Sequence, residues 1–410
     1  MQRSLDSRPS RGTITIMFNV CMLCYLWDLE DEGIDEVLDR IQGQVGVDGV
    51  AVVAASGPLA QLRRRPSAQS RLMRSRGGFY FQPDDAKYAA TRCKPVVSNW
   101  LKARNPLSKV AEACVRRGLP LRAVVDTRRI GRLAARYPAV SVKSAFGDVS
   151  PGCASLANRD FVELLRALIG DLASNYSVAT IELRHLDRLF DTDLLDSIPY
   201  ADALGPAGKE LFSVSFCESS MQSALQAGVD AEAARRSAQV TLSRAIDSSS
   251  PLGPSLDALL GGDPILAGYV AHQRGVQASV LRTLSAAAPC ELALHVTPAA
   301  PIDDLLAGLS AESRLTAVMY RTEEPGDSSA TGSFDAVRRS CSPSGSVRCE
   351  AVIPAWRPDS DEESALVRTV QQLANRGADG VTLDHYGIMT DRELTAAKQG
   401  VRFAKRSRGK

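Results

Sequence analysis

The stretch Val178–His185, VATIELRH, decides the interpretation of the fold. It is a short run of β-branched and apolar residues that ends in charged side chains, and it follows the amphipathic run 160–172. This order predicts a helix, a turn and then a buried strand over 178–183. Burying a carboxylate without a partner is costly, so Glu182 inside this run is a candidate functional residue.

Seven further buried strands follow from the same kind of pattern. Each is a short apolar run without the alternation of a half-exposed strand, as is typical of parallel strands that are covered on both faces. The eight predicted strands are 13–25, 49–55, 121–126, 178–183, 291–296, 315–320, 348–353 and 380–383.

Segments with helical spacing alternate with these strands. One of them begins at Pro106 and ends just before Gly118, as the capping preferences of helices predict. Strict alternation of strand and helix implies a parallel sheet with right-handed crossovers. The predicted helices are 33–44, 106–117, 160–172, 231–246, 265–284, 302–309, 334–339, 362–376 and 391–403.

Eight such units in 410 residues predict an α/β fold, the (β/α)8 or TIM barrel, with long insertions after strands two and four. The structural alternative is an open doubly wound sheet. That fold normally has a glycine-rich phosphate loop after its first strand, where this chain has CYLWDLED. We expect an extended or disordered tail at 1–12, a single barrel domain over 13–405 with insertions at about 61–99 and 187–288, and a basic tail at 406–410.

The composition is that of an ordinary globular protein, with 44% hydrophobic residues, 23% charged residues and a net charge of +2. Neither nucleic acid nor a membrane is an expected partner, because no strong charge bias and no run of 18 apolar residues occurs. The N-terminal region lacks the pattern of a signal peptide. The nine cysteines lie in apolar contexts, which favours reduced thiols and a cytoplasmic location.

Two short motifs are expected to be structural. Cys21 and Cys24 form a C-x-x-C inside a predicted strand, where residues three apart point to opposite faces. We therefore expect neither a metal ion nor a redox pair there, and no cofactor elsewhere. The basic run 63–65 is predicted to be a solvated loop, with binding of an acidic sugar or a phosphate as the alternative.

Functional residues of this barrel lie at the carboxyl ends of its strands, because the loops there converge on one mouth. The catalytic candidates are three carboxylates, Glu182, Asp384 and Asp126. Three of the four histidines of the chain also fall at predicted strand ends. The candidates for substrate binding are Tyr25, Asp28, His185, His295, Tyr320, Trp356, His385 and Tyr386.

Glu182 is the leading candidate for acid–base chemistry. A carboxyl group whose pKa is raised by burial can protonate a leaving oxygen, whereas an ionised one can act as a base or a nucleophile. The alternative is a structural ion pair between Glu182 and Arg184 or another neighbouring cation. Tyr320 and Trp356 are predicted either to form an apolar platform for a sugar ring or only to pack.

Several segments resemble a family of uncharacterised bacterial barrel proteins related to glycoside hydrolases. The resemblance extends from Cys24 to Gly387 and implies a barrel that acts on a carbohydrate or glycoconjugate. It is carried by CYLWDLEDEGIDEVLDRI (24–41), GGFYFQPD (77–84), AFGD (145–148), the Asn158 helix with the Glu182 strand, and GADGVTLDHYG (377–387).

The chain also departs from that family's pattern. Ala54 and Ala55 stand where the family usually has a Tyr-His pair, and the segment 191–210 lacks the usual histidine-rich run. Ser215-Phe-Cys217-x-x-Ser220 replaces a Cys-Phe-Cys-x-x-Cys segment, which argues against a metal site there.

Two functions from different classes remain open. The first is a glycoside hydrolase-like enzyme with Glu182 as acid/base and a second carboxylate such as Asp384, since such enzymes normally use two carboxyl groups roughly 5 to 10 Å apart. The second is a catalytically inactive or repurposed barrel that binds a glycan, a small polar ligand or a partner protein. Carboxylates held by arginines would indicate the second. Another barrel chemistry, such as a lyase or an isomerase, and assembly into a homo-oligomer are also left open.

Overall fold

The computed structural model describes residues 18–65, 69–189, 195, 198–297, 301–310, 312–322, 328–341, 347–355 and 363–408. Eight parallel strands form a sheet in the order β1-β13-β12-β11-β10-β9-β6-β2, and a further pairing of β1 with β2 closes it into a barrel. The predicted (β/α)8 fold is therefore confirmed. The strands are β1 (Asn19–Cys24), β2 (Gly49–Ser56), β6 (Leu121–Asp126), β9 (Thr180–Arg184), β10 (Glu291–Val296), β11 (Leu315–Arg321), β12 (Arg348–Pro354) and β13 (Gly380–Asp384).

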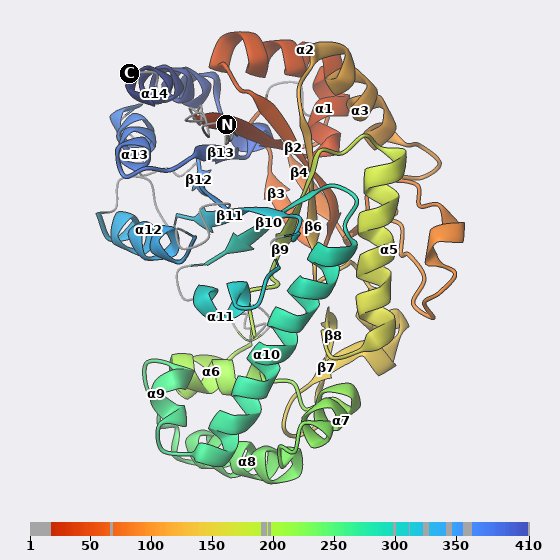
Figure 1. The fold of residues 1–410 in the computed structure, drawn as a ribbon, viewed down its shortest axis with the longest axis vertical. Helices are drawn as coiled ribbons and strands as arrows, with labels where there is room; N and C mark the ends of the chain where they lie inside the picture. Colours follow the sequence, from red (N-terminus) through yellow and green to blue (C-terminus); the bar gives the residue numbers. More distant parts are fainter. Residues whose placement is uncertain are drawn as a thin grey trace, which may run out of the picture.

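Helices surround the barrel on its outside (Figure 1). They are α1 (Leu26–Glu32), α2 (Ile34–Asp39), α3 (Pro106–Arg117), α5 (Arg159–Asn175), α10 (Pro264–Ala287), α11 (Ile302–Leu306), α12 (Ser328–Cys341), α13 (Glu363–Asn375) and α14 (Asp391–Arg408).

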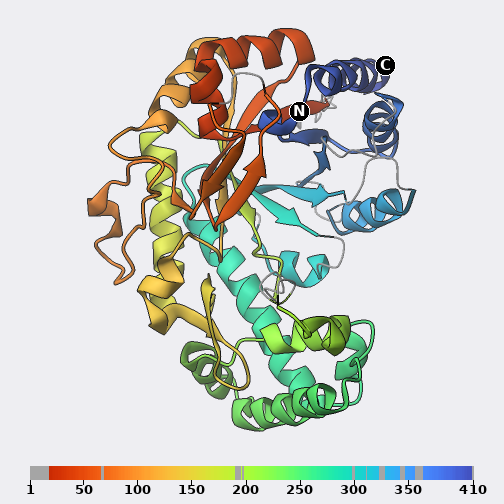
Figure 2. The same cartoon turned by 180° about the vertical axis from the view of Figure 1, so that it is seen from behind.

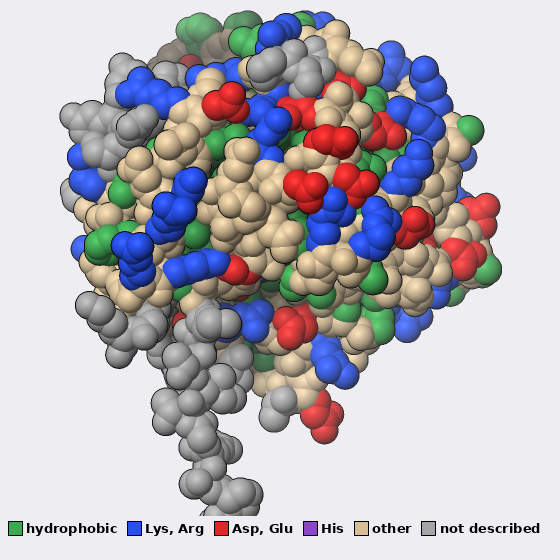
Figure 3. Space-filling view, turned by 90° about the horizontal axis from the view of Figure 1, so that it is seen from above, with side chains coloured by type: hydrophobic (Ala, Val, Ile, Leu, Met, Phe, Trp, Pro, Cys, Tyr) green, Lys and Arg blue, Asp and Glu red, His purple; other side chains and the backbone are tan. Residues whose placement is uncertain are grey.

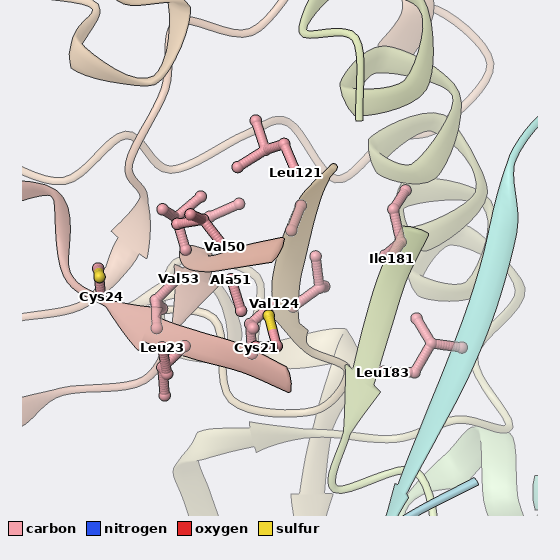
Figure 4. Close-up of a cluster of buried hydrophobic side chains, with 14 of the residues drawn as sticks. Cys21, Leu23, Cys24, Val50, Ala51, Val53, Leu121, Val124, Ile181 and Leu183 are labelled. Atoms are coloured by element: carbon pink, nitrogen blue, oxygen red, sulfur yellow. The ribbon is translucent and has the colours of Figure 1, made fainter. Parts of the chain in front are cut away.

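The main apolar core lies between the strands and these helices. Ile181 and Leu183 of β9 belong to it, together with Phe161 of α5 and Leu281 of α10. Figure 4 shows part of this core, with buried side chains of β1, β2, β6 and β9 gathered together. Successive residues of a strand point to opposite faces, so the neighbours of Ile181 and Leu183 face the barrel interior.

The barrel interior combines a few apolar residues with buried charges. Ala293, Ala317, Met319 and Val352 form a small cluster of their own there. Arg122 of β6 reaches across from its strand to contact the Met319 sulfur, 3.0 Å away.

The insertion after β2 contains a hairpin and an extra strand. β3 (Leu59–Leu62) and β4 (Leu72–Ser75) pair antiparallel, and β5 (Gly78–Phe79) pairs with the end of β2. Another hairpin follows β6, formed by β7 (Ser141–Lys143) and β8 (Val149–Ala154).

The predicted solvated loop at 63–65 is wrong for two of its three arginines. Arg63 and Arg65 are both 3% exposed. Arg63 pairs with Asp28 at 2.8 Å, and Arg65 pairs with Glu32 at 2.8 Å. These ion pairs join the insertion to α1 and explain why two cations separated by one residue are tolerated in buried positions.

The insertion after β9 forms a helical subdomain, which comprises α6 (Gly205–Ser213), α7 (Glu218–Gln226), α8 (Ala231–Ser248), α9 (Leu256–Leu260) and the first half of α10. It has an apolar cluster of its own, to which Leu242 of α8 and Tyr269 of α10 contribute. Figures 1 and 2 show it at one end of the molecule, with α10 running from it alongside the barrel. Because it follows β9, the subdomain extends from the side where the carboxyl ends of the strands lie.

Acidic and basic side chains lie next to one another on the face shown in Figure 3. Ion pairs such as that of Arg117 with Asp35, at 2.5 Å, are consistent with this mixture. Among the described residues, no helix combines the length and apolar character needed to cross a bilayer.

Candidate active site at the barrel mouth

The carboxyl ends of five barrel strands bring polar side chains together. We call this set the barrel mouth; its members are Asp126, Arg184, His185, His295, Arg321, Asp384 and His385. The register supports this grouping, because Asp126 of β6 is level with Arg184 of β9. Four of these seven residues are at least 94% buried, and buried polar groups at strand ends are costly unless they are paired or functional.

Asp126 and His185 form a closely paired carboxylate and imidazole. The Oδ2 atom of Asp126 lies 2.8 Å from Nδ1 of His185, while Oδ1 accepts hydrogen bonds from the backbone N–H groups of Arg128 and Arg129. Burial acts to raise the pKa of Asp126, but His185 and the two N–H donors outweigh it and lower the pKa below its ordinary value. Asp126 is thus held ionised in a fixed position.

His185 is placed for proton transfer by this arrangement. Its backbone φ of 63° is unusual for a residue other than glycine and lets the chain turn sharply after β9. The ring remains 28% exposed while Asp126 fixes one of its nitrogens. A carboxylate that orients a histidine in this way is a common arrangement for general acid–base catalysis.

Asp384 is the second carboxylate of the mouth. Its Oδ2 atom accepts a hydrogen bond of 2.5 Å from Nη1 of Arg321. Burial acts to raise the pKa of Asp384, but Arg321 and Arg184 outweigh this effect and lower it below the ordinary value. The group is therefore ionised near neutral pH and can act as a base, a nucleophile or a stabiliser of positive charge.

His385 and Tyr25 lie beside Asp384. Their rings pack edge to face at 4.8 Å, and Tyr25 in turn stacks on Trp27 at 4.6 Å. Burial lowers the pKa of His385 to about 4. Asp384 acts to raise it, and the nearby arginines add to the lowering. His385 is consequently neutral at pH 7, and its Nδ1 atom has no hydrogen-bond partner among the described residues.

His295 of β10 is 4% exposed, and neither of its ring nitrogens has a hydrogen-bond partner in the part of the chain that the structure describes. Burial is the main cause that lowers its pKa well below the ordinary value, and Arg184 and Arg321 add to this effect. His295 is therefore a neutral, buried ring whose two nitrogens meet no hydrogen-bond partner among the described residues.

Glu182 lies one layer deeper, inside the barrel. Its side chain is fully buried, and Oε1 accepts a hydrogen bond of 2.7 Å from Nε of Arg184. Its Oε2 atom is 3.9 Å from Arg122, which in turn pairs with Glu350 at 2.8 Å. This is the ion pair with Arg184 that the sequence offered as the alternative to acid–base chemistry. The acid/base role of Glu182 stays a prediction.

Two aromatic residues expected to bind substrate lie elsewhere. Tyr320 is fully buried and packs against Phe334 of α12, because the residue before the inward-pointing Arg321 must point outward. Tyr386 is also fully buried, and its hydroxyl donates to Glu32 at 2.7 Å. Both side chains therefore point away from the barrel mouth, and the role of Tyr320 and Tyr386 in substrate binding stays a prediction.

Asp28 and Trp356 complete the set of predicted residues. Asp28 is 1% exposed and pairs with Arg63. Burial raises its pKa to about 6 although Arg63 acts to lower it. This pair makes Asp28 part of the contact between α1 and the insertion, and its role in substrate binding stays a prediction. Trp356 lies outside the described residues.

Arg321 and Arg184 are the two mouth residues absent from the sequence-based candidates, although Arg184 was named as a possible ion-pair partner of Glu182. The predicted strand ended with the apolar run 315–320, whereas β11 continues by one residue to Arg321. Met319 and Ala317, two and four residues earlier, also point inward, and this alternation is the signal that could have identified Arg321.

Within the described ranges, no group of three or more His, Cys, Asp or Glu residues is placed to hold a metal ion.

Comparison with known proteins finds similarity in structure alone. No family model matches the chain, and no curated protein sequence matches it. The α-L-fucosidase isoenzyme 2 from Paenibacillus thiaminolyticus superposes with a TM-score of 0.56 at 12% identity, over 94% of this chain and 49% of that one. The β-galactosidase from the psychrophilic Marinomonas ef1 gives 0.51 at 13% identity, over 94% of this chain and 59% of that one.

These structural neighbours are glycoside hydrolases. Identities of 12% and 13% show a shared fold and nothing finer. The chain spans about half the length of the fucosidase, at 49%, and 59% of the galactosidase.

Proposed function

We propose that the protein is a glycoside hydrolase-like barrel that acts on a carbohydrate or glycoconjugate. The observation that carries this proposal is the convergence of Asp384 with the paired Asp126 and His185 at the carboxyl ends of the strands. The fold supports it as well, because glycosidases with this barrel react at that face.

The reaction needs a proton donor for the leaving oxygen and a carboxylate on the other side of the bond. We assign proton transfer to His185, oriented by Asp126. We assign to Asp384, ionised beside Arg321, either the activation of water or the attack on the anomeric carbon. Glu182 then acts one layer deeper, by holding Arg184 in place.

Activity on a panel of aryl glycosides and oligosaccharides tests these assignments. Asp384→Asn and His185→Gln should each lower kcat by roughly a hundredfold or more, the size expected for loss of an acid or a base. Asp257→Asn is the matched control, because its carboxylate is largely exposed on the helical subdomain, paired with Arg274. Wild-type rates in the two mouth variants would overturn the assignments.

Glu182→Gln separates the sequence-based assignment from this one. If Glu182 transfers the proton, Glu182→Gln should lose activity as severely as Asp384→Asn while remaining as stable as the wild-type protein. If Glu182 holds Arg184, the variant should be less stable, and each folded molecule should retain more activity than Asp384→Asn.

An inactive barrel that binds a glycan is the second candidate. It is favoured by the ion pairs of Asp384 with Arg321 and of Glu182 with Arg184. Binding of an oligosaccharide, measured by calorimetry, without turnover of any compound in the panel would support this candidate over the first.

We also propose that the protein works in the cytoplasm. All nine cysteines are free thiols, as expected in a reducing compartment. Fractionation of the source cells would test this, and recovery of the protein outside the cytoplasm would contradict it.

A further inference from the structure

The buried ring of His295 calls for a physical explanation. A buried imidazole normally uses at least one nitrogen in a hydrogen bond, and a buried polar group left without one costs free energy. His295 of β10 is 4% exposed, and both of its nitrogens lack partners among the described residues. A ligand group placed between this ring and its neighbours would remove that cost.

The neighbours of His295 define the charge of such a group. After burial, the largest effects on its pKa come from Arg184, Arg321, His185 and Arg188, and each of them lowers it. The strand register agrees with this, because Leu294 of β10 is level with Leu183 of β9 and His295 is therefore next to Arg184. A cation would be repelled from this position, and an anion would be attracted.

Arg184 provides a further donor at the same place. Its Nε atom is bonded to Glu182, but Nη2 is buried and has no hydrogen-bond partner in the described part of the chain. Arg321 contributes a guanidinium group that is 34% exposed and that contacts Asp384 through Nη1. Guanidinium groups bind carboxylates and oxyanions of sulfur or phosphorus by paired N–H donors.

We infer that His295, Arg184 and Arg321 form a subsite for a negatively charged substituent of the saccharide. The substituent is a carboxylate, as in a sugar acid, or a sulfate or phosphate ester. This inference rests on the proposed function for the saccharide part of the ligand. Glu182 and Asp384 occupy Nε of Arg184 and Nη1 of Arg321, so the anion would bind the other N–H groups of these two guanidinium groups.

Calorimetry with matched sugars tests the subsite without requiring turnover. The probes are glucuronate, glucose 6-sulfate, glucose 6-phosphate and, as the neutral reference, glucose. At least one anionic sugar should bind roughly tenfold or more tightly than glucose, the effect of a charge-assisted hydrogen bond. Preference for glucuronate identifies a carboxylate subsite, and preference for the esters identifies a subsite for tetrahedral anions.

His295→Asn should reduce the preference for the anionic sugar toward that of glucose. His272→Gln is the matched control, because His272 lies on α10 in the helical subdomain and contacts Ser223 there. Nitrogen NMR of the four imidazole rings gives a second readout in the unaltered protein: the anionic sugar should shift the signals of His295 and leave those of His272 in place.

The inference is overturned if glucose binds as tightly as its anionic counterparts, or if the His295 signals do not respond to any of them. Failure of the proposed function gives a different result. Anionic sugars would then bind through His295 although no glycoside is hydrolysed. Conversely, hydrolysis of neutral glycosides alone would uphold the proposed function and reject the subsite.

Discussion

At the scale of single residues, the buried charges of the barrel interior matter most. Arg122, Glu182, Arg184 and Glu350 form a chain of ion pairs inside a closed barrel. Such a chain adds little net stability when complete, but removing one member leaves an uncompensated charge in a poorly solvated position.

Glu182→Gln is therefore expected to lower the free energy of unfolding by on the order of 3 kcal/mol, because Arg184 loses its ionised partner. Chemical denaturation measures this. The control is Glu163→Gln, which removes an exposed i,i+3 pair with Arg166 and should change stability by less than about 1 kcal/mol. Equal effects of the two substitutions would contradict the ion-pair role of Glu182.

Acidification is expected to destabilise the protein through His385. Its pKa is about 4 in the folded protein, mainly through burial, with Arg184, Arg321 and Arg63 adding to this and Asp384 opposing it. Between pH 6.5 and 4 the unfolded chain binds a proton that the folded one does not. The unfolding free energy should thus fall as the pH falls, by on the order of 3 kcal/mol in total.

Thermal unfolding of wild type and His385→Asn at pH 7.0 and 4.5 checks this pH dependence. The variant lacks the titrating ring, so its melting temperature should fall less on acidification. Parallel losses in both proteins would rule out His385 as a source of the effect.

At the scale of elements, the sequence predicted the strands well because parallel barrel strands are covered on both faces. The segment 121–126 is all apolar except for Arg122 and Asp126, and it matches β6 residue for residue. The hairpin of β3 and β4 was not predicted, because its four-residue strands are partly exposed and have no long apolar run.

Long-range pairing was the part of the site that the sequence could not supply. Arg63 finds Asp28 across 35 positions of the chain, and nothing local distinguishes it from the exposed Arg64. Strand register had a similar effect, because a shift by one residue exchanges the inward and outward faces. Tyr320 was chosen for the mouth, but its neighbour Arg321 is the residue that points there.

Helix α10 offers a test of how elements depend on packing. Leu281 is fully buried between α10 and the barrel. Leu281→Ala should lower the unfolding free energy by about 2 to 5 kcal/mol, through lost burial and the cavity left behind. Leu225→Ala on α7 is the control, because Leu225 is 72% exposed and its truncation should cost less than about 0.5 kcal/mol. Urea denaturation of both variants gives the comparison.

At the scale of the whole molecule, α10 joins the two apolar clusters. Leu266 and Tyr269 near its start belong to the helical subdomain, whereas Leu281 and Leu284 near its end belong to the barrel core. Because one helix belongs to both clusters, loss of packing in one of them removes support from the other.

Leu242→Ala in α8 should therefore destabilise the barrel as well as the subdomain. Hydrogen exchange followed by mass spectrometry measures each part separately. We expect faster exchange in the second half of α10 and in β10, not only in α8. Faster exchange confined to α6–α9 would show that the two clusters unfold independently.

Because α10 is continuous over 24 residues, it also fixes the orientation of the helical subdomain relative to the barrel. Each residue of an α-helix turns the chain by about 100° and advances it by about 1.5 Å. One residue inserted near Gly275 would swing the helical subdomain around the helix axis to a different side of the barrel, while seven would return it almost to its starting azimuth. The number of residues in α10 thus sets the orientation of the helical subdomain above the strands. Homologous proteins that keep this orientation could lengthen or shorten the helix only by about seven residues, or two turns, at a time.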